Sequence, residues 1–276
     1  MTGAPPVALT IAGSDSGGGA GLQADLRTFT TCGVHGCVAV TAVTVQNSLG
    51  VTGFVPIPPS TVADQIRAVA TDIGIGAAKT GMLASAAIIS AVAEVCDEVG
   101  IGASVPLVVD PVAASMHGDP LLADDALDAL RSELFPRATL VTPNLDEVRL
   151  LVGLEVGSRA EQYTAAKKLH SLGSQWVLVK GGHLRADPQE RNPQCLDLLY
   201  DGSEFTAFTS PRLATPHTHG SGDTLAAAIT SALARGWTMP EAVGYGKRYI
   251  EQAVAHAYPL GAGIGPVSPF WRLRPP

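Results

Sequence analysis

Short, almost wholly apolar runs alternate along the chain with longer segments rich in alanine and leucine. This alternation is typical of βα units around a parallel sheet whose strands are covered on both faces. The strands expected in the first two thirds of the chain are Val7–Ala12, Val38–Val45, Leu107–Asp110, Thr139–Thr142 and Trp176–Lys180, with Val51–Pro56 pairing nearby at an edge. The helices expected between them are Leu22–Cys32, Thr61–Asp72, Ala84–Val99, Pro120–Leu134, Asp146–Val152 and Arg159–Leu172.

The pattern changes in the last third of the chain. Cys195–Tyr200 and Glu204–Thr209 flank the dipeptide Asp201-Gly202, which is a strong hairpin signal. We therefore expect the sheet to end in antiparallel strands. The polar, proline-broken stretch Arg185–Gln194 that precedes the hairpin predicts a loop. Two packed helices are expected after the hairpin, over Gly222–Arg235 and Pro240–Ala257.

The chain shows no internal repeat and no compositional break that would mark a linker between domains. Apolar residues make up 46% of the 276 residues and charged residues 16%, which is ample material for a buried core. The sequence therefore predicts one α/β domain over residues 1–276. Its expected architecture is a mostly parallel central sheet with helices on both faces and antiparallel edge strands.

Charge and cysteine content narrow the possible partners. The net charge of −7 argues against nucleic acid or an anionic membrane as partner, because both need clustered lysine and arginine. Backbone N–H groups can still bind phosphate locally on an acidic protein. The four cysteines are scattered without metal-ligand spacing, which predicts free thiols in a reducing compartment. The first residues show no signal peptide, and no apolar stretch reaches about 18 residues, so a cytoplasmic location is expected.

The segment His217–Thr224, with the sequence HTHGSGDT, carries the clearest chemical signal. Its small residues allow a sharp turn, and the apolar helix that follows adds unpaired first-turn N–H groups and the positive end of its dipole. Such a turn is typical of a cradle for phosphate oxygens. Asp223 stands where the turn becomes the helix, so from the residues alone it is either a helix cap or a catalytic base.

This turn resembles the anion hole of ribokinase-like kinases, and the chain as a whole resembles the hydroxymethylpyrimidine/phosphomethylpyrimidine kinases of thiamine biosynthesis. The matching stretches run in order over nearly the whole chain: LTIAGSDSGGGAGLQADL from Leu9, QN at Gln46, KTGML from Lys79, VDP from Val109, TPNLDE from Thr142, VKGGHL from Val179 and GIGPV from Gly263. The resemblance implies a ribokinase-like fold, ATP as phosphoryl donor, Mg²⁺ and a homodimer.

One position departs from the family pattern. The residue at position 223 is often cysteine in these kinases, whereas here it is the aspartate usual in the wider superfamily. Aspartate is chemically the easier base, so the change leaves activity in place. It weakens the distinction from pyridoxal kinases, which also carry aspartate there.

The resemblance implies a division of roles at the turn. Gly220, Ser221 and Gly222 would donate backbone N–H groups to the oxygens of the transferring phosphoryl group. Asp223 would accept the proton of the substrate hydroxyl, a role worth about 10²- to 10⁴-fold in rate.

A second set of residues is expected beside the nucleotide. The resemblance places Asn144, Lys180 and Gly182 near ATP, and Glu147 and Asp110 near Mg²⁺, which needs few protein oxygens. Asp110 also ends a strand, where open α/β sheets bind ligands. On the residues alone, Asn144 would more often be a helix cap, and Lys180 could be a surface lysine.

The pyrimidine ring needs donors and acceptors in its plane, because its nitrogens lose water on binding. Gln46 can donate and accept in one plane, and the family match makes it the best candidate for this contact. The peptide around Gly13 and Ala20 and the carboxylate of Asp25 would line the same pocket, with Met82 against the ring face. Met82 could equally be ordinary core, and Asp25 an acid on a helix surface.

Specific residues argue against three other interpretations of the sequence. A dinucleotide-binding fold needs an acid at the end of the second strand, where the chain has Val45-Gln46-Asn47. No Walker motif occurs, and His217 and His219 lack a third zinc ligand at plausible spacing, so we expect them to shape the loop. Two alternatives stay open: a pyridoxal or pyridoxine kinase on the same fold, and a non-catalytic protein that binds a pyrimidine.

Overall fold

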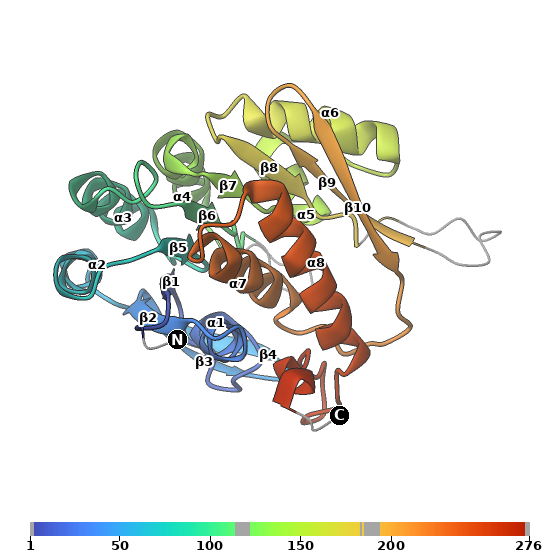
Figure 1. The fold of residues 1–276 in the computed structure, drawn as a ribbon, viewed down its shortest axis with the longest axis horizontal. Coiled ribbons are helices and arrows are strands. Elements are labelled where there is room, and N and C mark those ends of the chain that lie inside the picture. Colours follow the sequence, from blue (N-terminus) through green and yellow to red (C-terminus); the bar gives the residue numbers. More distant parts are fainter. Residues whose placement is uncertain (1–2, 114–121, 183, 185–193, 274–276) are drawn as a thin grey trace.

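The structure is a computed structural model that describes residues 3–113, 122–182, 184 and 194–273. Its centre is an eight-stranded sheet with the order β10-β9-β8-β7-β6-β5-β1-β2 (Figure 1). The parallel strands are β1 (Val7–Ala12), β2 (His35–Val40), β5 (Ala77–Thr80), β6 (Leu107–Val109), β7 (Leu140–Val141) and β8 (Trp176–Val179). The antiparallel strands at one edge are β9 (Gln194–Tyr200) and β10 (Phe205–Pro211). The predicted mostly parallel sheet with antiparallel edge strands is confirmed.

Helices cover both faces of this sheet, as predicted. One face packs against α2 (Pro59–Asp72), α3 (Ala86–Val99), α4 (Asp124–Ala129), α5 (Leu145–Val152) and α6 (Arg159–His170). The other face packs against α1 (Gly21–Thr31), α7 (Ser221–Leu233) and α8 (Met239–Ala255). Successive strand residues point to opposite faces, so Val109 joins the first of these cores and Val108 the second. No helix within the described ranges combines the length and the apolar character needed to cross a bilayer.

The predicted strand Val38–Val45 is wrong, because the chain leaves the central sheet at Thr41. β2 ends at Val40, and β3 (Ala42–Asn47) pairs antiparallel with β4 (Gly50–Pro56) in a separate two-stranded sheet. The apolar run is continuous across the break, so hydrophobicity alone could not show it. The break matters because it carries Gln46 out of the main sheet.

Two further expectations changed. β5 was missed, because its four residues, Ala-Ala-Lys-Thr, lack the apolar β-branched character of the other strands, yet all four are buried. The helix predicted over Pro120–Leu134 begins at Asp124 in the described part of the chain and continues as a π-helical turn over Leu130–Leu134. The predicted loop Arg185–Gln194 lies outside the described residues except for Gln194, which starts β9.

The two-stranded sheet β3–β4 is held over the glycine-rich turn that follows β1. The Ser16 hydroxyl donates to the Gln46 carbonyl at 2.6 Å and accepts from the Gln46 N–H at 2.8 Å. The Thr44 hydroxyl donates to the Ser14 carbonyl at 2.6 Å. On the other side, the Ile264 N–H donates to the Ser48 carbonyl at 3.0 Å. These contacts fix Gln46 relative to the carboxyl ends of the central strands.

Candidate active site

The residues proposed for chemistry meet where the parallel strands end and α7 begins. α7 starts at Ser221, and its N-cap Gly220 has a φ of +75°, which favours glycine. A Cβ at Gly220 would lie 2.0 Å from the Gly19 carbonyl oxygen, so no side chain fits between the two glycine-rich turns. A Cβ at Gly222 would lie 3.3 Å from Asp110 Oδ2 and 3.4 Å from Lys180 Nζ. The turn therefore sits directly on both of these side chains.

The backbone donors of this turn are only partly available. The N–H groups of Gly220, Gly222 and Asp223 have no hydrogen-bond acceptor among the described residues. The Ser221 N–H donates to the Thr218 carbonyl at 3.1 Å, so its predicted role as a phosphoryl donor does not fit this geometry. The helix terminus still has three amides without an acceptor among the described residues, together with the positive end of its dipole.

Asp223 lies in the first turn of α7, and its side chain is 16% exposed. No described residue donates a hydrogen bond to its carboxylate, so it does not act as a helix cap in the described part of the chain. Its Oδ1 lies 3.9 Å from the Lys79 Nζ, an ion-pair distance that is too long for a hydrogen bond. The carboxylate is thus ionically supported while its acceptor positions remain open.

Lys79 was given no role from the sequence, and Asp25 was placed on a pocket wall. In the structure both side chains are fully buried, and Lys79 Nζ donates to the two Asp25 oxygens at 2.8 and 2.9 Å. Thr10 Oγ1 donates to Asp25 Oδ2 at 2.7 Å. The expectation that the Asp25 carboxylate lines the pocket therefore needs correction. A lysine inside a strand of small residues was the available signal for this pair.

A second charged cluster, around Lys180, lies beside Gly222. Lys180 Nζ donates to Asp110 Oδ1 at 2.9 Å and lies 4.0 Å from Glu147 Oε2. Thr142 Oγ1, which the sequence analysis did not single out, donates to Asp110 Oδ1 at 3.0 Å. Burial would lower the pKa of Lys180, but the carboxylates of Asp110 and Glu147 outweigh it and raise that pKa. Lys180 is therefore an internal cation and no surface lysine.

Asn144 and Glu147 form the helix cap that was the competing interpretation of Asn144. The Asn144 side chain accepts from the Glu147 N–H at 2.9 Å, and the Glu147 carboxylate accepts from the Asn144 N–H at 2.8 Å. Burial raises the pKa of Glu147 to about 7 against the pull of Lys180. Val112, a β-branched residue with a φ of +43°, follows Asp110 in a strained turn beside this carboxylate.

The site offers few protein ligands for a magnesium ion. No group of three or more His, Cys, Asp or Glu side chains within the described ranges has the arrangement of a metal site. Asp110 and Glu147 are two buried carboxylates that both approach Lys180. Because Mg²⁺ keeps several waters and takes one or two carboxylates plus phosphate oxygens, this pair matches its usual protein share.

The remaining substrate candidates gather around the glycine-rich turn after β1. The Gly13 N–H donates to the Met82 carbonyl at 3.1 Å, and a Cβ at Gly13 would lie 3.5 Å from Met82 Sδ. Ala20 and Gln46 are half-buried, as is Met82. Gly182 is exposed, and its carbonyl accepts from Arg212 Nη1 at 2.7 Å.

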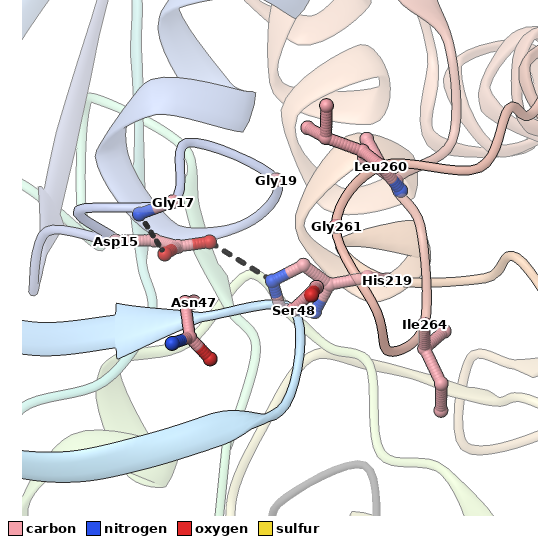
Figure 2. Close-up of a pocket in the computed structure, with 10 residues that line it drawn as sticks. Asp15, Gly17, Gly19, Asn47, Ser48, His219, Leu260, Gly261 and Ile264 are labelled. Atoms are coloured by element: carbon pink, nitrogen blue, oxygen red, sulfur yellow. Dashed lines mark hydrogen bonds and ion pairs between the residues drawn. The ribbon is translucent and has the colours of Figure 1, made fainter.

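Two polar residues join the glycine-rich turns. His219 Nε2 lies 2.9 Å from Asp15 Oδ2, and the Asp15 carboxylate accepts from the Gly17 N–H at 2.8 Å (Figure 2). The same carboxylate accepts from the Ala20 N–H at 2.9 Å. Burial opposes ionisation of Asp15, but its bond to His219 and these amides lower its pKa. His217 Nδ1 accepts from the Gly265 N–H at 3.0 Å. Both histidines shape the loop, as expected, and His219 borders a cavity of about 300 Å³ shown in Figure 2.

The site combines a helix terminus whose amides lack acceptors among the described residues, an open carboxylate and buried lysines at the strand ends, features that fit the class of a small-molecule kinase. Residues 15–268 match the phosphomethylpyrimidine kinase family, and the chain belongs to it. The chain is 60% identical to the hydroxymethylpyrimidine/phosphomethylpyrimidine kinase of Mycobacterium leprae over 96% of this chain and 94% of that protein. It is 43% identical to the Bacillus subtilis enzyme of the same name over 95% of this chain and 94% of that enzyme.

Solved structures of two kinds of kinase, for pyridoxal and for phosphomethylpyrimidine, are similar to this chain. The ADP complex of Bacillus subtilis pyridoxal kinase matches with a TM-score of 0.86 and 38% identity, covering 97% of this chain and 99% of that one. The phosphomethylpyrimidine kinase of Clostridium difficile matches with a TM-score of 0.78 and 36% identity, covering 90% of this chain and 99% of that one. The ribokinase-like fold expected from the sequence is thereby confirmed.

The raised pKa of Glu147 predicts a pH-dependent effect of Glu147→Gln on stability. Between its ordinary value of 4.5 and about 7, the folded protein keeps a proton that the unfolded chain has lost. Wild-type stability therefore falls as pH rises through this window, whereas glutamine keeps the cap without this loss. Relative to wild type, the variant should gain ~1–3 kcal/mol between pH 5 and pH 8.

Urea unfolding at both pH values, with EDTA present, measures this gain. Glu161→Gln is the matched control, because Glu161 also bonds the first turn of a helix but is exposed, and the Gly157 N–H lowers its pKa. The control should show no such gain. A stability difference for Glu147→Gln that stays constant from pH 5 to pH 8 would contradict the assignment.

Proposed function

We propose that the chain transfers the γ-phosphoryl group of ATP to the hydroxymethyl group of 4-amino-5-hydroxymethyl-2-methylpyrimidine. A second transfer to the resulting monophosphate would give the diphosphate used in thiamine biosynthesis. The observation that carries this proposal is the open Asp223 carboxylate beside unpaired amides at the start of α7. A phosphoryl acceptor placed there meets a base and an anion cradle at one point.

The first transfer follows from these positions. The substrate O–H bond breaks and its proton passes to Asp223, while the oxygen forms a bond to the γ-phosphorus. The bond from that phosphorus to the bridging oxygen of ATP breaks and ADP leaves. The N–H groups of Gly220 and Gly222 stabilise the charge on the transferring oxygens, and Lys180 lies beside the same turn.

Magnesium would be held by Asp110 and Glu147, with Asn144 positioning Glu147 through the helix cap. When bound, the ion would neutralise part of the negative charge of the ATP phosphates. Gly182 and Lys180 would border the nucleotide. The raised pKa of Glu147 fits a carboxylate that is only weakly compensated until a cation binds.

The pyrimidine would lie between the glycine-rich turn and the two-stranded sheet. Gln46 would hydrogen-bond a ring nitrogen and the exocyclic amine, with Gly13, Ala20 and Met82 as the surrounding wall. The hydrogen bonds of Ser16 to the Gln46 backbone support this position, because they hold β3 against the turn.

A pyridoxal kinase is the second candidate, since pyridoxal kinases on this fold are among the matching structures. A coupled assay offering the pyrimidine alcohol, its monophosphate and pyridoxal side by side tests both. The wild type should prefer the two pyrimidines, and Asp223→Asn should lose about 10²- to 10⁴-fold in kcat on the alcohol while affecting the monophosphate much less. Preference for pyridoxal would favour the second candidate, and no turnover of any of the three would favour a binding protein.

Gln46→Ala is expected to raise KM for the pyrimidine alcohol ~10-fold or more, because unpaired ring nitrogens lose their bonds to water on binding. KM for ATP should stay within about twofold, since Gln46 lies in the two-stranded sheet whereas Lys180 follows β8 of the central sheet. Steady-state kinetics with each substrate varied in turn gives both values. Equal increases in the two KM values would move Gln46 out of the pyrimidine pocket.

We also propose a homodimer formed through the two-stranded sheet. Val43, Val45 and Val55 share one face of β3–β4 and are 50%, 62% and 65% exposed. Such an apolar face on an edge sheet is typical of a protein interface. Sedimentation equilibrium should give twice the chain mass of 28.3 kDa, and the variant Val43→Lys/Val55→Lys should give the monomer mass. A monomeric wild type at micromolar concentration would refute this.

The proposal includes one kinase domain over the whole chain, acting in the cytoplasm. The eight-stranded sheet draws strands from both halves of the chain, which supports a single domain. All four cysteines are free thiols, three of them buried, which supports a reducing compartment.

A further inference from the structure

A second acidic side chain lies behind Asp223. Asp25 on α1 is fully buried, and the two cross-strand neighbours Thr10 on β1 and Lys79 on β5 both donate to its carboxylate. None of these three side chains has exposed surface. A substrate cannot contact the buried Lys79–Asp25 pair directly, so direct substrate binding does not explain the presence of this pair.

Lys79 stands between the two carboxylates. Its Nζ is 2.8 and 2.9 Å from the Asp25 oxygens and 3.9 Å from Asp223 Oδ1. Burial opposes its charge, but Asp25, Asp223 and Asp110 outweigh burial and raise its pKa, so it stays an ammonium. Burial and the neighbouring Asp223 raise the pKa of Asp25 to about 6 even with Lys79 present.

Without this ammonium, no cation of the described residues would lie within ion-pair distance of the Asp223 carboxylate. This holds whether Lys79 is removed alone or together with Asp25. The other charged groups around the start of α7 are Asp110, Lys180 and Glu147, which pair with one another, and Lys180 also interacts with Asp223 at longer range. Among the described residues, Lys79 is the cation within ion-pair distance of the Asp223 carboxylate.

We propose that Lys79, anchored by Asp25 and Thr10, is a positioning residue that holds the Asp223 carboxylate directed at the substrate hydroxyl. The 3.9 Å separation suits this role, because a direct hydrogen bond would occupy the oxygen that must accept the proton. Gly81 lies next to both groups, since a Cβ there would be at ordinary contact distance from each, 3.7 Å from Lys79 Nζ and 4.0 Å from Asp223 Oδ1.

The role of Lys79 rests on the proposed function. Because that function comprises two phosphoryl transfers, the effect of Lys79 on each transfer can be compared. In the first transfer the alcohol proton must pass to Asp223 as the new O–P bond forms and ADP leaves. In the second transfer the attacking phosphate oxygen already carries charge, so no proton needs an acceptor. Lys79 should therefore matter for the alcohol and little for the monophosphate, whereas a merely structural role would affect both alike.

The double variant Lys79→Met/Asp25→Asn tests this. It removes both buried charges together, and replacing a buried ion pair as a unit usually preserves folding, whereas removing one partner does not. Turnover of the alcohol should fall about 30-fold or more, and turnover of the monophosphate should stay within about threefold of wild type. KM for ATP should change by less than about twofold. Equal falls on both substrates, or no fall on the alcohol, would overturn the proposal.

The chain offers a matched control in a second buried pair of the same type. Lys247 Nζ lies 2.6 Å from Asp197 Oδ2, and Asp197 Oδ1 accepts from the Gly181 N–H at 2.9 Å. Lys247→Met/Asp197→Asn disturbs the fold comparably without facing Asp223, so any loss should be equal for the two substrates. A substrate-selective loss in this control would show that the selectivity does not come from Lys79.

Asp223→Asn separates failure of this inference from failure of the proposed function. Retention of alcohol turnover in that variant would refute the base itself. Loss of alcohol turnover in Asp223→Asn, with no selective loss in the Lys79 double variant, would refute only the role of Lys79.

Discussion

The site depends on two lysines buried at the carboxyl ends of the central strands. Lys79 and Lys180 flank the start of α7, and each is compensated by aspartate from a neighbouring element. Removing one partner from a buried pair costs about 3–5 kcal/mol, so each lysine depends on its aspartate in the folded protein. Folding therefore fixes Lys180 beside the turn where phosphate would bind and Lys79 beside Asp223.

Close backbone approach supplies the second constraint. Gly220 lies against the Gly19 carbonyl, and the His219–Asp15 pair ties the same two turns together. A side chain at Gly220 would push the turns apart and displace the amides of α7. The glycines thus set the distance between the proposed base and the proposed substrate pocket, and the contact between His219 and Asp15 sets the relative orientation of the two turns.

The charged clusters around Lys180 and Lys79, near the start of α7, are suited to different roles in catalysis. The cluster around Lys180 holds two carboxylates close to one ammonium and suits a cation and nucleotide phosphates. The cluster around Lys79 is closed to solvent and reaches the site only through Asp223. One cluster would meet the phosphoryl donor and the other would support the acceptor's base, which fits an in-line transfer between them.

The sequence by itself determined the parallel sheet, most helix positions, the anion-binding turn and the family, because these follow from local periodicity and from short ordered motifs. Only the tertiary structure decided that β5 is a strand and that Val38–Val45 breaks at Thr41. Only the tertiary structure showed that the Ser221 N–H donates to the Thr218 carbonyl and that Asn144 caps α5. The burial of Asp25 against Lys79 was likewise visible only in the structure. Those outcomes depend on contacts between residues as far apart as positions 25, 79 and 223, and no local pattern records which partner a buried charge will find.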